Sequence, residues 1–261
     1  MKNKSDMLSY CSNWYKTFSG QSSLESLDGL CQDILSEIFG YYAVELGFLS
    51  GRRDLLQSSR TAASFSVVNQ SLTGLLNNTK SPVISTIEQL PLATDNVDLV
   101  IASHVLELSK DPHQVLREID RVLVPEGDCI LIGFNPYTFS RISSHFRHTL
   151  NRKKNDYKMR SIPRVRDWFS LLGFEVVDVH YVGMRPAVKN KRLYETMGFL
   201  DNLGRYAGAV FGNIYVLHAK KRVVAMSKHK KVWMAPAVLS GGKVALNNTA
   251  KKIRRENYSN L

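Results

Sequence analysis

Two apolar runs on either side of one amphipathic helix constrain the fold of this chain most. Residues 97–103 and 129–134 have the length and almost continuous apolar character of buried strands. Between them, Asp111 and Pro112 provide a helix start, and apolar residues then recur every three or four positions, at Val115, Leu116, Ile119, Val122 and Leu123. A strand, a helix and a second strand in this order predict an α/β fold with a largely parallel sheet.

Further strand-like runs extend this pattern to seven strands. They cover residues 41–47, 65–69, 83–87, 174–182 and 213–224, while residues 8–39 and 162–172 have helical periodicity. Pro125-Glu126-Gly127 predicts a turn after the central helix. An irregular segment joins the last two strands in place of a clear helix, so we expect a terminal antiparallel hairpin. The expected fold class is α/β, with a seven-stranded, mostly parallel sheet.

Positive charge is concentrated at one end of the chain. The net charge is +12, yet residues 220–261 contain eleven Lys and Arg against one acid, so residues 1–219 are nearly neutral. Periodicity also fades after residue 224. We therefore predict an N-terminal helical segment (1–40), a central domain (41–224) and a basic, disordered tail (225–261). The tail is either a solvated extension or a contact for something anionic.

Several classes of protein are disfavoured by what the sequence lacks. It contains no apolar run of about eighteen residues, and its first residues lack the apolar core of a signal peptide. Cys11, Cys31 and Cys129 are widely spaced and form no CxxC pair. We therefore expect a cytoplasmic protein with no membrane segment, no disulfide framework and no metal site.

One ordered motif extends over roughly forty residues. Its parts are Leu90-Pro91-Leu92 with Asp98-Leu99-Val100, then His104-Val105-Leu106-Glu107, Asp111-Pro112-His113, and Arg121-Val122-Leu123-Val124-Pro125-Glu126-Gly127. This run, with Gly133-Phe134-Asn135-Pro136 after it, resembles the type 11 family of class I S-adenosylmethionine-dependent methyltransferases, above all its stand-alone bacterial members. The weaker strand pattern extends the resemblance over residues 10–222. The resemblance implies a Rossmann-like fold, S-adenosylmethionine as cofactor and methyl transfer as the reaction.

The resemblance places the cofactor loop after the first strand. The family's [DE]-x-G-x-G-x-G pattern falls on Glu45, Gly47 and Gly51, which retain the acid and two of the glycines. Leu49 replaces the middle glycine and Phe48 adds bulk beside it. Glycines in this loop let the backbone approach a ligand and adopt positive φ, so the loop is a degenerate form of the family pattern.

Two further cofactor positions also depart from the family. The acid that holds the ribose hydroxyls falls on Asn69, and the Asp that binds the adenine amino group falls on Thr86, next to Ile87. Each lost charged hydrogen bond weakens binding by roughly 1.5–3 kcal/mol unless neighbouring groups compensate.

The resemblance places Ser103 and His104 at the methionine end of the cofactor. His104 is the candidate general base, with a satisfied histidine at a strand end as the structural alternative. His113 is a weaker candidate, since the first turn of a helix favours a solvated or capping role. Asn135-Pro136 follows the fifth strand, where some members of the family contact the methyl acceptor.

The sequence leaves the acceptor open. Basic and aromatic residues alternate over 137–160, a composition found both in solvated caps and in segments that contact phosphates and bases. Together with the basic tail, this segment keeps RNA open as a partner beside a small molecule.

Three functional hypotheses follow. The first is a methyltransferase with an unidentified acceptor, and the second is a catalytically degenerate member of the family that acts as a binding or regulatory partner. The third is an RNA-binding protein on the same fold. A dinucleotide-dependent dehydrogenase is disfavoured, because the first strand lacks GxGxxG and no acid follows about twenty residues later.

Overall fold

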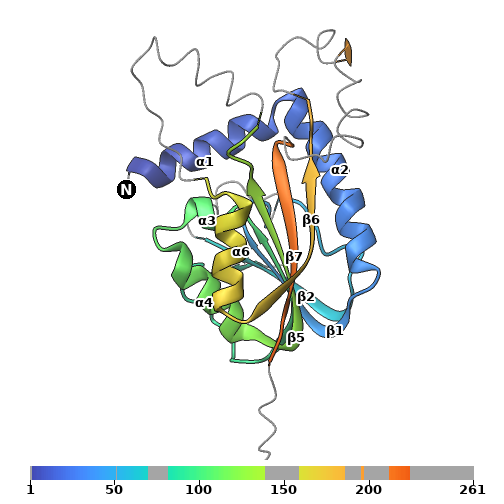
Figure 1. Cartoon of the computed structure of the whole chain (residues 1–261), viewed down its shortest axis with the longest axis vertical. Helices are drawn as coiled ribbons and strands as arrows, with labels where there is room; N and C mark the ends of the chain where they lie inside the picture. Colours follow the sequence, from blue (N-terminus) through green and yellow to red (C-terminus); the bar gives the residue numbers. More distant parts are fainter. Residues whose placement is uncertain are drawn as a thin grey trace, which may run out of the picture. The chain divides into compact units, whose positions relative to one another are not determined.

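A seven-stranded sheet organises the part of the chain that the computed structural model describes, which is residues 2–50, 52–69, 82–138, 159–185, 195–196 and 212–223. Its strand order is β3-β2-β1-β4-β5-β7-β6 (Figure 1). The strands are β1 (Phe39–Gly47), β2 (Arg60–Val68), β3 (Val83–Ile84), β4 (Val97–Ser103), β5 (Leu123–Phe134), β6 (Phe174–Val182) and β7 (Ile214–Lys221). The described residues all belong to one compact unit, Met1–Val224, and the predicted tail lies outside them.

The strand directions confirm the predicted fold class. β3, β2, β1, β4 and β5 are parallel to one another, whereas β7 runs antiparallel to both β5 and β6. The carboxyl ends of the parallel strands therefore meet at one edge of the sheet, where open α/β sheets bind ligands.

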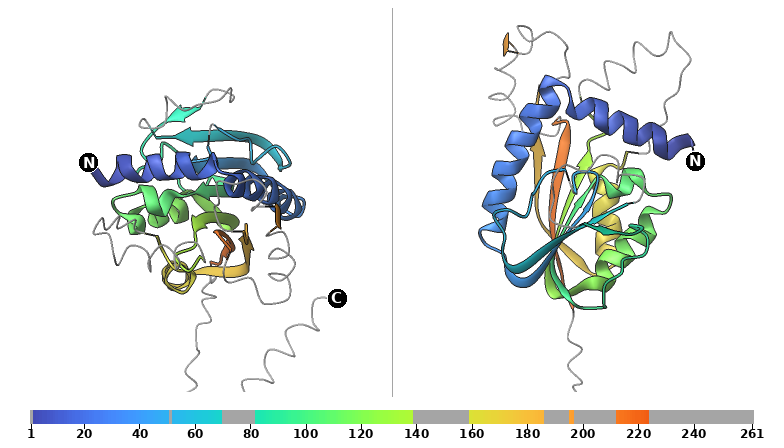
Figure 2. Two further views of the ribbon diagram at one scale, coloured as in Figure 1. Left: turned by 90° about the horizontal axis from the view of Figure 1, so that it is seen from above. Right: turned by 180° about the vertical axis from the view of Figure 1, so that it is seen from behind.

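Five helices surround the described sheet: α1 (Lys2–Tyr15), α2 (Phe18–Leu35), α3 (Val105–Leu108), α4 (Pro112–Val122) and α6 (Ile162–Leu171). α4 begins as predicted, because the Asp111 side chain accepts a hydrogen bond of 3.1 Å from the amide of Gln114. α6 is followed by Gly173 with φ of +84°, a left-handed conformation that ends the helix. α1 runs across the edge of the sheet where β4 and β5 end (Figures 1 and 2).

The predicted helix over residues 8–39 is wrong in its extent. The segment folds as two helices, and the Thr17 side chain caps the second by accepting from the amide of Gly20 at 3.1 Å. Apolar periodicity continued through the break because both helices bury one face. The last four residues, Phe39 among them, already belong to or lead into β1.

The turn predicted at Pro125-Glu126-Gly127 is a bulge within β5. Leu123 pairs with Val97, and the register then shifts so that Asp128 pairs with Leu99. Glu126 has φ of +64°, a left-handed conformation that absorbs the extra residues without ending the strand. The strand predicted over 83–87 is also shorter than expected, because the chain turns between Thr86 and Gln89 directly after Ile84.

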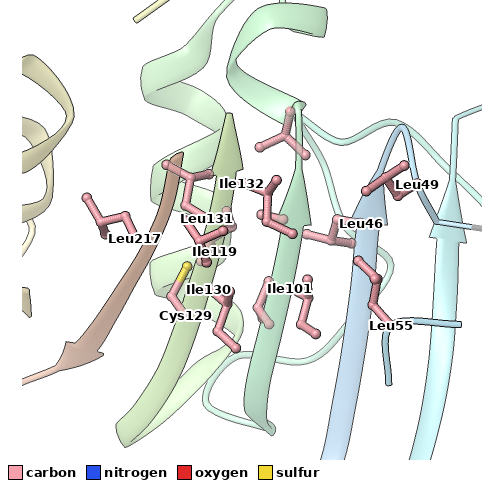
Figure 3. Packing of buried hydrophobic residues seen from close by; sticks show 14 of the residues in the cluster. Leu46, Leu49, Leu55, Ile101, Ile119, Cys129, Ile130, Leu131, Ile132 and Leu217 are labelled. Atoms are coloured by element: carbon pink, nitrogen blue, oxygen red, sulfur yellow. The ribbon is translucent and has the colours of Figure 1, made fainter. Parts of the chain in front are cut away.

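Neighbouring strands contribute the centre of the core. Figure 3 shows Leu46 of β1, Ile101 of β4, Ile130 and Ile132 of β5 and Leu217 of β7 lying along the sheet, with Ile119 of α4 among them. These side chains are almost completely buried, in agreement with the apolar runs of the sequence.

Charged residues of the sequence motif hold the backbone of the fold. The Asp98 carboxylate accepts from the amides of Tyr41 and Tyr42 at 2.8 and 2.9 Å, which ties β4 to the start of β1. Glu118 accepts from the amide of Leu90 at 2.9 Å, and the Arg121 guanidinium donates to the carbonyls of Leu90 and Leu92. The spacing of these motif residues therefore reflects how α4 anchors the segment before β4.

Within the described residues, no helix combines the length and apolar character needed to cross a membrane.

Candidate functional site

The carboxyl ends of β1 and β4 are joined directly. Gly47 pairs with Ser103 in the sheet, and beyond this pair the amide of Phe48 donates to the carbonyl of Ser103 at 2.8 Å. The amide of His104 donates to the carbonyl of Ile132 in β5 at 2.8 Å. These bonds place the residues after β1, β4 and β5 beside one another.

The loop after β1 is bonded tightly to Ser103. The Ser103 hydroxyl accepts from the amide of Leu49 and donates to the carbonyl of Leu46, both at 2.9 Å. Gly47 has φ of +98°, and a Cβ atom there would lie 2.0 Å from the Ser103 carbonyl oxygen. Glycine is therefore required at position 47 by the contact with β4, and the amides of Phe48 and Leu49 are used within the protein.

Glu45 is buried beneath this loop. Burial and the nearby negative charge of Asp54 raise the pKa of its carboxyl to about 8, against a hydrogen bond from the Leu55 backbone that lowers it. The Glu45 Oε1 atom has no hydrogen-bond partner. An unpaired buried oxygen is costly, and such atoms are common where a ligand completes a site.

His104 is completely buried in a left-handed conformation, with φ of +53°. Its Nε2 atom lies 2.6 Å from the Tyr15 hydroxyl, and its ring stacks on Phe134 with the centroids 4.2 Å apart. Its Nδ1 atom has no hydrogen-bond partner and lies 3.8 Å from Oε1 of Glu107. A carboxylate facing Nδ1 favours the proton on that nitrogen, which leaves Nε2 to accept from the Tyr15 hydroxyl.

Tyr15 comes from α1 and closes the site. Its ring stacks on Phe48 at a centroid distance of 5.7 Å, while Trp14 packs edge-on against Phe134 at 5.1 Å. Burial raises the pKa of the Tyr15 phenol well above its ordinary value, so the hydroxyl retains its proton. Sequence reasoning missed Tyr15, because nothing local in α1 indicates that it reaches a residue after β4.

Glu107 also has a structural partner. Its Oε1 atom accepts from the amide of Phe134 at 2.8 Å, which ties α3 to the end of β5, and its Oε2 atom is buried without a partner.

The other cofactor candidates are spread over the same edge of the sheet. Asn69 is buried directly after β2, and Ile87 is buried in the turn after β3. Thr86 is exposed in that turn, and its hydroxyl approaches the Gln89 carbonyl at 3.5 Å. Gly51 lies outside the described residues. The structure thus brings together Glu45, Gly47, Ser103 and His104, with Asn69 at the end of the next strand.

The weaker candidates, His113 and Asn135, contact other parts of the fold. His113 is exposed on α4, and its ring lies 4.2 Å from that of Trp168 in α6. The Asn135 side chain donates to the Gly212 carbonyl at 2.9 Å and accepts from the amide of Tyr137 at 3.0 Å. The predicted RNA-contact segments, most of 137–160 and the basic tail, lie outside the described residues.

Comparisons with known proteins identify a related domain in this chain. A family model described as "Methyltransferase domain" matches residues 53–131. The uncharacterized protein YafS of Escherichia coli K12 is 32% identical over 144 residues, which cover 54% of this chain and 56% of YafS. Malonyl-[acyl-carrier protein] O-methyltransferase of Alcanivorax borkumensis is 30% identical over 97 residues, which cover 37% of this chain and 32% of that enzyme. The chain thus spans about half the length of the first relative and about a third of the second.

A solved structure shares the fold. A S-adenosylmethionine-dependent methyltransferase from Thermotoga maritima superposes with a TM-score of 0.55 at 17% identity, covering 84% of this chain and 98% of the other. At that identity the likeness shows the fold alone. Residues 53–131 thus match a methyltransferase domain, and the chain has the fold of class I S-adenosylmethionine-dependent methyltransferases.

Proposed function

We propose that this protein transfers a methyl group from S-adenosylmethionine to an acceptor bound at the carboxyl ends of β1, β4 and β5. The observation that carries the proposal is the convergence of Glu45, Gly47 and His104 at this edge, in a chain whose residues 53–131 match a methyltransferase domain. Ligands of open α/β sheets bind at this edge. The relative that methylates malonyl-[acyl-carrier protein] supports the reaction class.

The polar atoms of the site fit a charged, polar cofactor. Buried atoms without partners are found on Glu45, Arg52, His104 and Glu107, so both oxygen and nitrogen atoms are available for hydrogen bonds. The amides of Phe48 and Leu49 already donate to Ser103. The ligand would therefore be held by side chains and not by these two amides. Asn69 would face the ribose hydroxyls, to which its amide offers hydrogen bonds without charge.

The bound cofactor would supply a methyl group already activated by its sulfonium, so the protein's task is to orient the acceptor. The aromatic rings of Tyr15, Phe48 and Phe134 exclude water around His104. Where the acceptor must lose a proton, its proton would pass to the Tyr15 oxygen as the phenol proton passes to Nε2 of His104. Glu107, 3.8 Å from Nδ1, would stabilise the imidazolium that forms.

Two classes of acceptor fit the proposal, a small molecule and RNA. The Alcanivorax borkumensis relative is named for malonyl-[acyl-carrier protein], whose malonyl group carries a carboxylic acid, and this favours an acceptor that bears an acid. Binding to RNA would instead show a steep fall of affinity with salt.

Calorimetric titration of the purified chain with S-adenosylmethionine and S-adenosylhomocysteine tests the proposal. We expect micromolar binding of both, and about tenfold weaker binding for Asn69→Ala, because the residue after β2 loses its hydrogen-bonding amide. Asn96→Ala is the matched control, since this exposed residue precedes β4 at the opposite edge of the sheet.

A wild-type protein that binds neither compound at millimolar concentration, by heat or by thermal shift, would overturn the proposal. The family fold would then serve as a binding or regulatory scaffold. The bonds from the Phe48 and Leu49 amides to Ser103 would be the structural reason, since they occupy the loop from within.

A further inference from the structure

Arg52 is a half-buried cation without a partner among the described residues. It follows the loop after β1, and its guanidinium carbon lies 3.9 Å from the centre of the Phe48 ring. Its Nε and Nη2 atoms are both shielded from solvent, and neither makes a hydrogen bond. The cation–π contact with Phe48 offsets part of the cost of burying this charge, but it leaves the N–H donors unsatisfied.

The same two atoms form a carboxylate-binding edge in two other arginines of this chain. Arg53 donates from Nε and Nη2 to the carboxylate of Asp28. Arg121 donates from Nε and Nη2 to the two oxygens of Glu118, at 3.1 and 2.9 Å. This side-on pair of donors matches the two oxygens of a carboxylate. In Arg52 the same two atoms make no hydrogen bond.

The acids nearest to the site do not fill this edge. Oε1 of Glu45 and Oε2 of Glu107 are themselves buried without hydrogen-bond partners, so neither oxygen binds the Arg52 guanidinium. Burial lowers the pKa of Arg52, in keeping with a cation that lacks a compensating anion. A half-buried guanidinium whose shielded N–H donors lack partners, beside a candidate binding site, is expected where a ligand supplies the anion.

Arg52 also contacts an aromatic ring that packs against Tyr15 and His104, the candidate catalytic pair. The Phe48 ring that carries the guanidinium stacks on Tyr15 and lies edge-on to His104, with centroids 5.7 and 6.2 Å away. The Phe48 ring therefore contacts both Arg52 and the Tyr15–His104 pair.

We propose that the Nε–Nη2 edge of Arg52 binds a carboxylate of the ligand in this site. The inference rests on the proposed function and deepens it, because the cofactor has a carboxylate at its amino-acid end. A carboxylate on the methyl acceptor is the second source of the same chemistry. Arg52 is thus assigned as a residue that positions the ligand by binding the ligand's carboxylate.

Two ligands that differ in the carboxylate test whether the cofactor supplies the carboxylate that Arg52 binds. S-adenosylhomocysteine carries the carboxylate, whereas 5′-methylthioadenosine has the same nucleoside and thioether without the amino acid. We expect Arg52→Met to weaken binding of the first at least tenfold and to leave the second within twofold. Arg52→Lys should lie between, since it keeps the charge and loses the planar edge. Arg53→Lys is the control, because its donors already bind Asp28.

The acceptor as the source is tested by thermal melting in sodium glutarate and in sodium chloride at matched ionic strength. A glutarate-dependent rise in melting temperature that is present in the wild type and absent in Arg52→Met supports a carboxylate site. This result would stand even if neither nucleoside binds and the proposed function is wrong. The inference is overturned if Arg52→Met changes neither the preference for S-adenosylhomocysteine nor the glutarate effect. Equal weakening of both nucleosides also overturns it, because that result assigns Arg52 to packing against Phe48.

Discussion

The hydroxyl of Tyr15 lies 2.6 Å from Nε2 of His104, although 89 positions separate the two residues in the sequence. This bond makes α1 part of the candidate site, because Tyr15 covers the histidine that follows β4. The family motif of residues 90–127 ends far from α1, so the motif describes only one wall of the site. The other wall is built by rings from α1 and by the loop after β1.

Replacement of Tyr15 by Phe should destabilise the fold. The variant keeps the stacked ring and removes the hydroxyl, which leaves Nε2 of His104 buried without a partner, as Nδ1 already is. We expect a loss of about 1–3 kcal/mol in the free energy of unfolding, measured by urea denaturation. Tyr41→Phe, at a residue that is 74% exposed, should change it little. Equal stability of the two variants would show that the Tyr15–His104 bond contributes nothing net.

Replacement of Gly47 by alanine should destabilise the fold, apart from any effect on ligand binding. Gly47 has positive φ, and a Cβ atom there would meet the Ser103 carbonyl at 2.0 Å, so β1 and β4 would have to separate. We expect Gly47→Ala to lower the free energy of unfolding by at least about 2–3 kcal/mol. Gly29→Ala is the matched control, because nothing lies within 4 Å of a Cβ atom there in α2. It should gain about 0.5–1 kcal/mol from helix propensity. Chemical denaturation of both variants measures the contrast, and similar stabilities would contradict the close contact.

Stability should fall between about pH 4.5 and pH 8 because of Glu45. Its pKa is raised to about 8 in the folded protein, so the folded state holds the proton more tightly than the unfolded chain does. The favourable contribution is complete below the unfolded pKa and is lost as the pH rises through the folded pKa. The loss is on the order of 1.4 kcal/mol per unit of pKa difference, as an upper limit.

Glu45→Gln removes this titration, so its urea midpoint should vary less over the same pH range. Glu37→Gln, at an exposed residue just before β1, should retain the wild-type slope. Identical slopes in the wild type and Glu45→Gln would show that Glu45 is not protonated in the folded state at neutral pH.

Entry of a ligand should change the surroundings of Trp14. His104 and Phe48 are almost completely buried beneath α1, so a ligand that binds against Tyr15 must alter the packing of the Trp14 ring beside it. The chain has three tryptophans, and Trp168→Phe with Trp233→Phe leaves Trp14 as the only emitter. We expect saturating S-adenosylhomocysteine to shift its emission maximum to longer wavelength. Calorimetric binding without any change in emission would show that α1 stays in place.

Much of the fold could be predicted from local patterns. The strands over 97–103 and 174–182, the Asp111 cap, the Gly173 stop and the terminal antiparallel pair all follow from periodicity and turn chemistry. The bulge at Glu126 could not, because Pro-Glu-Gly has the composition of a turn and only pairing with β4 keeps this segment in the strand. The break between α1 and α2 was hidden for a similar reason, since both helices present an apolar face to the same core.

For the candidate site, the family resemblance pointed to Glu45, Gly47, Ser103 and His104, and in the structure these residues lie at or just after the carboxyl ends of β1 and β4. Spacing along the chain is sufficient there, because parallel strands must end at one edge of their sheet. Nothing in the sequence reveals that Tyr15 binds His104, that Ser103 occupies the loop amides, or that Arg52 lacks a partner. These are contacts between surfaces that meet only after the sheet has formed, and they depend on packing geometry that local propensity does not encode.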